Sequence, residues 1–250
     1  MLVDKGLAST KSKAQALIMS GLVFVNGQIS DKSGRILPDD VHLSVKEVFP
    51  YVSRGALKLE KASQEFSLDF RGKTICDIGS STGGFTDFAL QNGATKVFAI
   101  DVGTGQLAQK IREDNRVIVM EKTDFRDVGI QGSDPYQGPT LSEPIDMFVC
   151  DVSFISLKKI IPKIVEIIQN SKLKTRNSAE LVLLIKPQFE AGAKEVSRGK
   201  GVIKDEVLRQ QIVTDIQTFA IEHNFKVIGV TESPITGAKG NVEYLLYLRF

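Results

Sequence analysis

The sequence contains few of the residues from which disulfide frameworks and metal sites are built. Its 250 residues include only two cysteines, Cys76 and Cys150, and two histidines, His42 and His223. Two cysteines do not make a disulfide framework, and the histidines lie far apart without a partner pattern, so we expect no metal site. Each cysteine precedes an aspartate that ends an expected strand. If those strands are neighbours, the thiols lie close together in the sheet, buried and without a catalytic role.

Long apolar runs and a strong charge excess are also missing. No uninterrupted apolar stretch approaches the roughly 18 residues that span a membrane. The opening MLVDKGLASTKSKAQ turns polar too early for a signal peptide. The net charge of +2 and the pI of about 8.4 do not by themselves predict a polyanionic partner. These absences predict a cytoplasmic protein with reduced thiols and no membrane contact.

The first 47 residues have the pattern of a small α+β domain. Ser9 or Thr10 is a candidate N-cap for a helix that ends near residue 20. Asn26-Gly27 between apolar segments predicts a hairpin, because both positions of a type I′ turn need positive φ. The alternation over Val41–Val45 predicts another strand.

Strands and helices alternate in residues 72–250, after a linker and a helix at 48–71. The expected strands are Lys73–Ile78, Lys96–Asp101, Val117–Glu121, Ile145–Asp151, Glu180–Lys186, Phe225–Glu232 and Val242–Phe250, and the expected helices lie at about 84–91, 104–112, 157–169 and 205–223. This alternation predicts a mostly parallel sheet covered on both faces. The last two strands have no helix between them, so we expect them to pair antiparallel at one edge. Residues 129–144 predict a turn-rich loop.

The segment CDIGSSTGGFTDF, residues 76–88, is typical of a nucleotide-binding loop. It lacks the lysine of a phosphate-binding Walker loop, and its glycine spacing does not match the dinucleotide pattern G-x-G-x-x-G. Asp77, two residues before Gly79, sits badly beside a pyrophosphate but suits a ligand with a positive group. S-adenosylmethionine has an ammonium and a sulfonium and no phosphate, so we expect it as the cofactor.

Acidic residues at the ends of further strands support this interpretation. Asp101 follows Gly79 by 22 residues, about where an acid accepts hydrogen bonds from ribose hydroxyls in such folds. Asp124 is expected near the adenine amino group, and Asp151 ends a fourth strand. A single aspartate at a strand end is often only a helix cap, but four of them beside a glycine loop favour a cofactor site. The expected cofactor-binding residues are Asp77, Gly79, Ser80, Ser81, Gly83, Gly84, Phe85, Asp101, Val102, Asp124, Phe125 and Asp151.

Six motifs in order along the chain resemble those of the TlyA (hemolysin A) family. They are YVSRGALKLEKA, DIGSSTGGFTDFAL, AIDVGTGQL, CDVSFISL, LIKPQFE and GNVEYLLYL. The resemblance covers nearly the whole chain. It implies a small S4-type RNA-binding domain before an FtsJ-like domain with the Rossmann-like class I methyltransferase fold, an α/β fold with a mostly parallel seven-stranded sheet. It also implies S-adenosylmethionine-dependent methylation of ribose 2′-hydroxyls in ribosomal RNA.

The resemblance also carries over a catalytic set, Lys58, Asp151, Lys186 and Glu243. In this interpretation Lys186, aligned by Asp151, is the base or oxyanion stabiliser, and Lys58 and Glu243 orient the ribose. Without the resemblance, Lys186 is a solvated strand end and Glu243 an edge-strand charge. The opening MLVDKGL departs from the basic start that is usual in the family, which indicates an N-terminally incomplete RNA-binding helix.

Expected RNA contacts come from basic clusters and one aromatic residue. Phe154 either packs in the core or stacks on a flipped target base. The loop at residues 190–206 either closes over substrate or is an ordinary surface loop. The expected contacts are Lys5, Lys11, Lys13, Arg54, Phe154, Arg198 and Lys200, with ribosomal RNA or ribosomal subunits as partners. The alternative functions are a membrane-active hemolysin and a non-catalytic RNA-binding ribosome-assembly factor.

Overall fold

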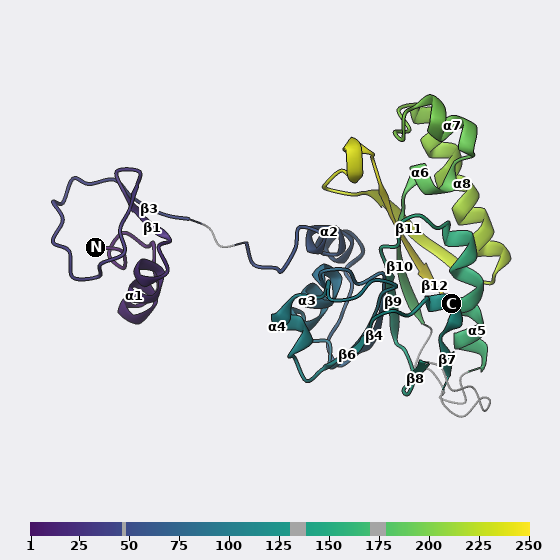
Figure 1. Cartoon of the computed structure of the whole chain (residues 1–250), viewed down its shortest axis with the longest axis horizontal. Coiled ribbons are helices and arrows are strands. Elements are labelled where there is room, and N and C mark those ends of the chain that lie inside the picture. Colours follow the sequence, from purple (N-terminus) through teal and green to yellow (C-terminus); the bar gives the residue numbers. More distant parts are fainter. Residues whose placement is uncertain (47–48, 131–138, 171–178) are drawn as a thin grey trace. The chain divides into compact units, whose positions relative to one another are not determined.

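The chain folds into two compact units, Met1–Pro50 and Tyr51–Phe250. The structure is a computed structural model that describes residues 1–46, 49–130, 139–170 and 179–250 (Figure 1). The expected linker at 48–71 therefore divides, because its helical part belongs to the second unit. Each unit has its own hydrophobic core, and each is described by itself below.

The first unit consists of one helix and a three-stranded antiparallel sheet. Helix α1 spans Lys11–Met19, and the Thr10 hydroxyl oxygen caps it by accepting a hydrogen bond from the Lys13 amide at 3.1 Å. The strands are β1 (Val23–Val25), β2 (Gln28–Ile29) and β3 (Leu43–Val45), in the order β2-β1-β3. Asn26 and Gly27 both have positive φ, 49° and 81°, and connect β1 to β2. The expected hairpin is confirmed.

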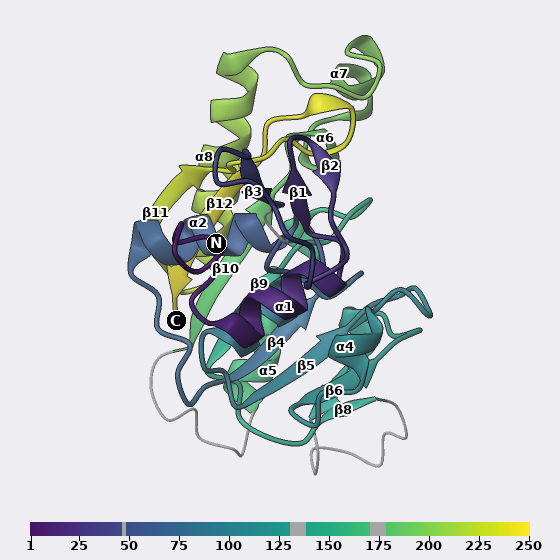
Figure 2. The ribbon, with the colours of Figure 1, turned by 90° about the vertical axis from the view of Figure 1, so that its left-hand side faces the viewer.

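A seven-stranded sheet forms the centre of the second unit, in the order β11-β12-β10-β9-β4-β5-β6 (Figures 1 and 2). Its strands are β4 (Thr74–Ile78), β5 (Lys96–Ile100), β6 (Val117–Met120), β9 (Met147–Cys150), β10 (Glu180–Ile185), β11 (Lys226–Glu232) and β12 (Tyr244–Arg249). The five strands from β6 to β10 are parallel, and β12 runs antiparallel to both of its neighbours. The last two strands pair antiparallel as expected, and β12 lies inside the sheet while β11 forms its edge.

Helices cover both faces of this sheet. One face packs against α2 (Ala56–Phe66), α3 (Gly84–Gln91) and α4 (Gln109–Arg112), and the other against α5 (Ile161–Asn170) and α8 (Glu206–Glu222). The short helices α6 (Pro187–Glu190) and α7 (Ala193–Arg198) follow β10, and the 3-10 turns are η1 (Phe125–Asp127), η2 (Leu157–Lys159) and η3 (Ala238–Gly240). The two cores are built from the alternate side chains of the same strands. This is the Rossmann-like methyltransferase arrangement that the family resemblance implies.

Three expected elements differ in their details. The helix expected at 104–112 begins only at Gln109, because Ala108, with a ψ of 141°, is not helical and bends precede it. The helix expected at 157–169 divides into η2 and α5, and Pro162 lies at the start of α5, where its missing amide hydrogen costs no helical bond. The loop expected at 129–144 contains two short parallel strands, β7 (Gly129–Ile130) and β8 (Thr140–Leu141). Its residues 131–138 lie outside the described residues.

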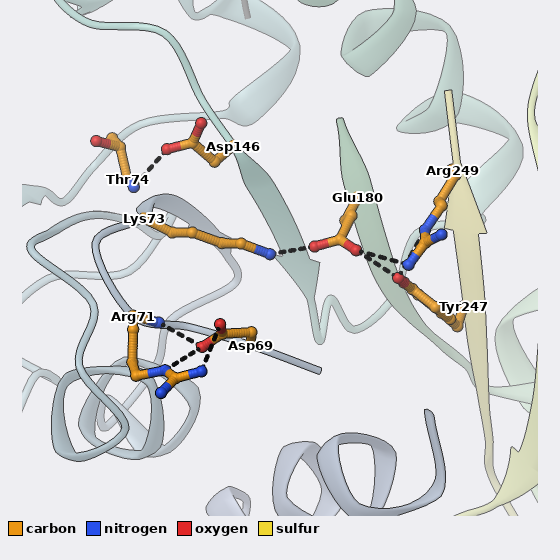
Figure 3. Close-up of polar contacts among 8 residues, drawn as sticks. All are labelled: Asp69, Arg71, Lys73, Thr74, Asp146, Glu180, Tyr247 and Arg249. Atoms are coloured by element: carbon orange, nitrogen blue, oxygen red, sulfur yellow. Dashed lines mark hydrogen bonds and ion pairs between the residues drawn. The ribbon is translucent and has the colours of Figure 1, made fainter. Parts of the chain in front are cut away.

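A polar cluster connects the strands at the end of the sheet where β4, β9 and β10 begin (Figure 3). Glu180 at the start of β10 pairs with Lys73 and accepts a hydrogen bond from the Tyr247 hydroxyl at 2.5 Å. Asp146 accepts one from the Thr74 amide at 2.9 Å. Because these contacts join β4, β9, β10 and β12, they stabilise the strand register on which the opposite end of the sheet depends.

Candidate active site

Four charged side chains meet where the central strands of the second unit end. Asp151 follows β9 and Lys186 follows β10, while Glu243 directly precedes β12 and Lys58 lies on α2. Since β12 is antiparallel to β10, with Tyr244 opposite Ile185, the start of β12 reaches the end of β10. The sheet order therefore assembles four groups that are spread over 186 positions of the sequence, from 58 to 243.

The four groups form a continuous chain of ion pairs. The Lys58 ammonium lies 3.1 Å from Asp151 Oδ2 and 2.9 Å from Glu243 Oε2. The Lys186 ammonium lies 2.6 Å from Asp151 Oδ1 and donates a hydrogen bond to the Ser153 hydroxyl at 2.8 Å. Lys58, Lys186 and Glu243 are buried. Two positive and two negative charges balance in the site, which limits the cost of removing them from water.

The pKa values of this cluster follow from its pairing. Burial alone would lower the pKa of Lys58, but the charges of Asp151 and Glu243 outweigh it and raise that pKa above its usual value. Burial would raise the pKa of Asp151, but Lys186 and Lys58 outweigh it and hold that pKa below its usual range. Near neutral pH, Lys58 is therefore an ammonium and Asp151 a carboxylate.

The glycine loop between β4 and α3 touches the same cluster. Gly79 has a φ of +82°, and a Cβ there would lie 2.8 Å from the carbonyl oxygen of Asp151. Only glycine combines that conformation with that approach. Gly237 lies against the other side of the cluster, since a Cβ there would lie 2.0 Å from Glu243 Oε1. Gly79 thus leaves room for the backbone at Asp151, and Gly237 leaves room for the carboxylate of Glu243.

Asp77 in β4 is buried with half of its carboxylate unsatisfied. Its Oδ2 accepts a hydrogen bond from the Thr86 hydroxyl at 2.6 Å, whereas Oδ1 has no partner among the described residues. Burial raises the pKa of Asp77 to about 7, the Thr86 hydrogen bond opposes the rise, and the charges of Asp151 and Asp101 add to it. A fully buried acceptor without a partner is rare, and a bound cation beside Oδ1 would satisfy it.

Two cavities open beside the glycine loop and share five lining residues. The larger, of about 500 Å³, contains Asp101, Asp124 and Arg126, and the smaller, of about 360 Å³, contains Asp77 and the paired charges. The shared residues are Gly79, Ser81, Asp151, Ser153 and Phe154. All of the expected cofactor-binding residues except Gly83, the N-cap of α3, line one cavity or the other.

The strand-end aspartates of the larger cavity make contacts that the sequence does not reveal. Asp101 accepts hydrogen bonds from the Ser81 amide at 2.8 Å and the Gly103 amide at 2.7 Å, so it holds two turns together. Asp124 pairs with Arg126, whose hydrogen bonds lower the pKa of that carboxyl. The Phe125 side chain is buried in the core, so only its backbone is available to a ligand.

An exposed aromatic residue stands beside the paired charges. The side chain of Phe154 is 91% exposed and its φ is +64°, a backbone conformation that is strained for a bulky residue. Its ring centroid lies 4.9 Å from that of Phe189, and the Lys186 ammonium lies 5.9 Å from the Phe189 centroid. Of the two alternatives that the sequence leaves open, core packing is therefore wrong.

Several residues of the site carry no signal in the sequence. Ser153 contacts Lys186, and Phe189 contacts Phe154. Glu190 accepts hydrogen bonds from the Ser156 hydroxyl at 2.5 Å and the Leu157 amide at 2.8 Å, and so connects α6 to the loop that carries Phe154. The motifs CDVSFISL and LIKPQFE contain these residues, but no spacing within them predicts the contacts.

The remaining expected residues are distributed as follows. The side chains of Lys5, Lys11 and Lys13 are exposed on the first unit, and those of Arg54, Arg198 and Lys200 on the second.

Cys76 and Cys150 are buried free thiols on the neighbouring strands β4 and β9, as expected. Among the residues that the structure describes, no group of three or more potential metal ligands is found, and no helix is long and apolar enough to cross a membrane.

Comparison with known proteins agrees with this geometry. Residues 51–250 match the model of the FtsJ-like methyltransferase family, and residues 1–42 match the S4 domain. Hemolysin A of Brachyspira hyodysenteriae is 43% identical over 246 residues, which cover 98% of this chain and 95% of that protein. The 16S/23S rRNA (cytidine-2′-O)-methyltransferase TlyA of Mycobacterium tuberculosis is 39% identical over 250 residues, with 99% and 87% covered.

A solved structure extends the similarity from sequence to fold. The crystal structure of a Lactococcus lactis protein described as a candidate hemolysin is 49% identical and matches with a TM-score of 0.71, over 81% of this chain and 89% of that one. Together with the family matches, this similarity covers both units of the chain. The chain belongs to the TlyA (hemolysin A) family, whose members join an S4 domain to an FtsJ-like methyltransferase domain.

Proposed function

We propose that this protein transfers a methyl group from S-adenosylmethionine to ribose 2′-hydroxyls of ribosomal RNA. The observation that carries the proposal is the ion-paired set Lys58, Asp151, Lys186 and Glu243, which lines the smaller cavity together with the unsatisfied carboxylate of Asp77, next to the larger cavity. The similarity to a relative named as an rRNA (cytidine-2′-O)-methyltransferase supports the choice of substrate.

The residues around the two cavities fit S-adenosylmethionine. When bound, this cofactor supplies an electrophilic methyl group on a positively charged sulfur. The unpartnered Oδ1 of Asp77 suits its ammonium, since a buried carboxylate gains most from a charge-assisted hydrogen bond. Asp101 in the larger cavity has lone pairs left for ribose hydroxyls, and Val102, Asp124 and the Phe125 backbone would flank the adenine.

The paired charges are suited to a weakly acidic ribose hydroxyl. That group must lose its proton as it attacks, and a positioned lysine assists as base or by stabilising the oxyanion. Lys58 is held as an ammonium by two carboxylates, so we assign it and Glu243 to orienting the ribose. Lys186 has Asp151 and the neutral Ser153 as its partners, and we assign it to the reacting hydroxyl.

Exposed groups around the smaller cavity fit the rest of the target. Phe154 offers an open ring face on which a base removed from its stack would rest, and base–aromatic stacking is worth roughly 1–3 kcal/mol. Residues 1–47, with Lys5, Lys11 and Lys13, form the proposed RNA anchor, and residues 72–250 with the preceding helix form the catalytic domain.

Methyl transfer from labelled S-adenosylmethionine to isolated ribosomal subunits tests the proposal. Unmodified small and large subunits are each incubated with the full chain, and the methylated positions are mapped by their resistance to alkaline cleavage, which requires a free 2′-hydroxyl. The Asp151→Asn variant is the matched control, because it keeps the shape and removes the charge that pairs both lysines. Alkali-resistant label with the wild type alone is expected. Label in bases, or none on either subunit, would overturn the assignment.

A further inference from the structure

Two lysine-glycine turns project beside the smaller cavity. Lys200 and Lys239 have φ values of +51° and +58°, and each precedes a glycine with positive φ, Gly201 or Gly240. Three amides of these turns are used internally: the Lys200 amide donates to the Ser197 carbonyl at 3.0 Å, the Gly201 amide to the Val196 carbonyl at 2.9 Å, and the Gly240 amide to the Gly237 carbonyl at 3.1 Å. The exposed lysine side chains carry the charge that the turns present to a ligand.

The Asn241 side chain connects the two turns by hydrogen bonds. Its side chain is 2% exposed, and its Nδ2 donates hydrogen bonds to the Gly201 carbonyl at 2.9 Å and the Ala238 carbonyl at 3.0 Å. Its Oδ1 accepts one from the Ile203 amide at 3.1 Å. A Cβ at Gly201 would lie 3.3 Å from the Lys239 ammonium, so this charge rests against the turn that carries Lys200.

The turns are connected directly to the proposed catalytic site. Asn241 lies two residues before Glu243, and Gly237 and Ala238 line the smaller cavity together with Lys58 and Lys186. Figures 1 and 2 show α7 and the loop with η3 projecting from the same end of the sheet. The lysine turns therefore stand at the rim of the cavity in which the target ribose would react.

The cationic side chains at this rim have no acidic partners in the part of the chain that the structure describes. Within the described parts of the chain, Arg198, Lys200 and Lys239 form no ion pair. Surface lysines are usually solvated singly, but here a buried asparagine holds two lysine turns next to each other, against the mutual repulsion of their charges. A polyanion that passes over the rim would relieve that repulsion and release its own counterions.

We propose that Arg198, Lys200 and Lys239, the cationic rim, bind the phosphates of the RNA strand next to the target nucleotide, and that Asn241 is the positioning residue that holds the rim together. The location of the rim rests on the proposed function. The RNA-phosphate contact itself is a binding property, and it is tested below without methyl transfer.

The test compares binding of the full chain to isolated ribosomal subunits and to protein-free ribosomal RNA over a range of salt concentrations. In the Lys200→Ala/Lys239→Ala variant we expect roughly tenfold weaker binding to both. We also expect the slope of log K against log salt to fall by about one to two, since each lost phosphate contact removes about 0.7–0.9 from it. The matched control is Lys226→Ala, another exposed lysine, at the opposite end of the sheet. Its affinity and slope are expected to stay at the wild-type values.

Asn241→Ala separates positioning from charge, because it removes no charge. It is expected to weaken RNA binding and lower the salt slope, while calorimetry shows unchanged cofactor affinity and Lys200→Ala adds less than it does in the wild type. An unchanged slope of log K against log salt in the Lys200→Ala/Lys239→Ala variant would overturn the proposal that the cationic rim binds phosphates. A loss seen with subunits but not with free RNA would overturn it in favour of a ribosomal protein partner. If RNA binding follows these expectations but the methyl-transfer assay shows no activity, the proposed function is wrong, whereas the proposal that the rim binds RNA phosphates is still supported.

Discussion

Asp151 is the residue on which the balance of the paired charges depends, because among the described residues it alone forms ion pairs with both lysines. Its two oxygens face different partners, Lys58 at 3.1 Å and Lys186 at 2.6 Å. Glu243 balances Lys58 from the other side at 2.9 Å. Lys58 is thereby fixed between two carboxylates, and Lys186 is left with one carboxylate and one hydroxyl. Because of this asymmetry, we assign to Lys186 the role of base or oxyanion stabiliser at the reacting hydroxyl.

Replacing Lys186 tests this assignment at the level of one group. Lys186→Ala is expected to lower the single-turnover methylation rate by roughly a hundredfold or more, the scale of one positioned acid–base group. Cofactor affinity should change little, because the interaction is realised in the transition state. Lys186→Arg should restore little activity, since a guanidinium is bulkier and cannot deprotonate. A near-normal rate for Lys186→Ala would transfer the role to Lys58.

Asp77 links the pH dependence of cofactor binding to a single buried carboxylate. Its pKa of about 7 in the ligand-free protein means that it becomes protonated as the pH falls from 8 to 6, whereas a bound ammonium favours the ionised form. We expect calorimetry to show roughly tenfold weaker S-adenosylmethionine binding at pH 6 than at pH 8, the effect of one proton taken up over one pH unit below the pKa. Asp77→Asn is the control and should lack this decline. An equal decline in Asp77→Asn would mean that another group is responsible.

The same carboxylate affects folding stability in the opposite direction: a higher pH favours cofactor binding but lowers the stability of the ligand-free protein. A carboxyl group whose pKa is raised in the folded state favours folding below its unfolded pKa near 4, and that contribution is lost as the pH rises through about 7. At pH 8 the ligand-free protein therefore holds an unsatisfied buried charge. Asp77→Asn should raise the free energy of unfolding at pH 8 by about 1–3 kcal/mol, measured by denaturant titration, while it weakens cofactor binding. A destabilised variant at pH 8 would contradict the burial argument.

Helix α6 connects the segment that holds Lys186 to the loop that follows Asp151. It begins directly after Lys186, and its last residue, Glu190, accepts hydrogen bonds from Ser156 and Leu157 in the loop after Asp151. Burial raises the pKa of Glu190, although the Leu157 amide and the Ser156 hydroxyl oppose the rise. Glu190 thus fixes the spacing between the segments that hold Asp151 and Lys186, without itself lining either cavity.

We expect Glu190→Ala to lower the methylation rate about tenfold or more, since small displacements of positioned groups are costly, with little change in cofactor affinity. Glu190→Gln should recover much of the rate, because it keeps a side-chain oxygen for the Leu157 amide. Ser156→Ala in the Glu190→Ala background should have little further effect. Additive losses in this double-mutant cycle, or no recovery with Gln, would show that Glu190 acts only through general stability.

The strands were predictable from sequence, whereas the order of β11 and β12 was not. Strands such as β9 and β10 are continuous apolar runs, which two-sided burial requires. Either of the last two strands satisfies the same pattern at the edge, yet only the observed order brings Glu243 to Lys58. Contacts of Ser153 and Glu190 depend on packing between distant segments, so no local pattern announces them. The charged set itself was predictable only through a family resemblance.

At the scale of the whole molecule, the chain divides into two units with separate cores. The second unit begins with contacts of its own: the Val52 amide donates a hydrogen bond to Asp87 at 2.8 Å, and the Tyr51 hydroxyl donates one to Glu60 at 2.8 Å. A cut before Tyr51 leaves these bonds, both cavities and the paired charges intact. The first unit contributes the exposed Lys11 and Lys13, both on α1.

Deleting residues 1–50 should therefore separate RNA anchoring from cofactor binding. We expect the 51–250 fragment to unfold cooperatively and to bind S-adenosylmethionine, because its core is complete without the first unit. Its affinity for ribosomal RNA should fall, and the slope of log K against log salt should shrink by about two to three if Lys5, Lys11 and Lys13 each contact a phosphate. Filter binding at several salt concentrations, beside the full chain, measures both quantities. Equal affinity and equal slope for the two proteins would move the RNA anchor out of the S4 domain and onto the methyltransferase domain, where the cationic rim would then carry the electrostatic part of binding alone.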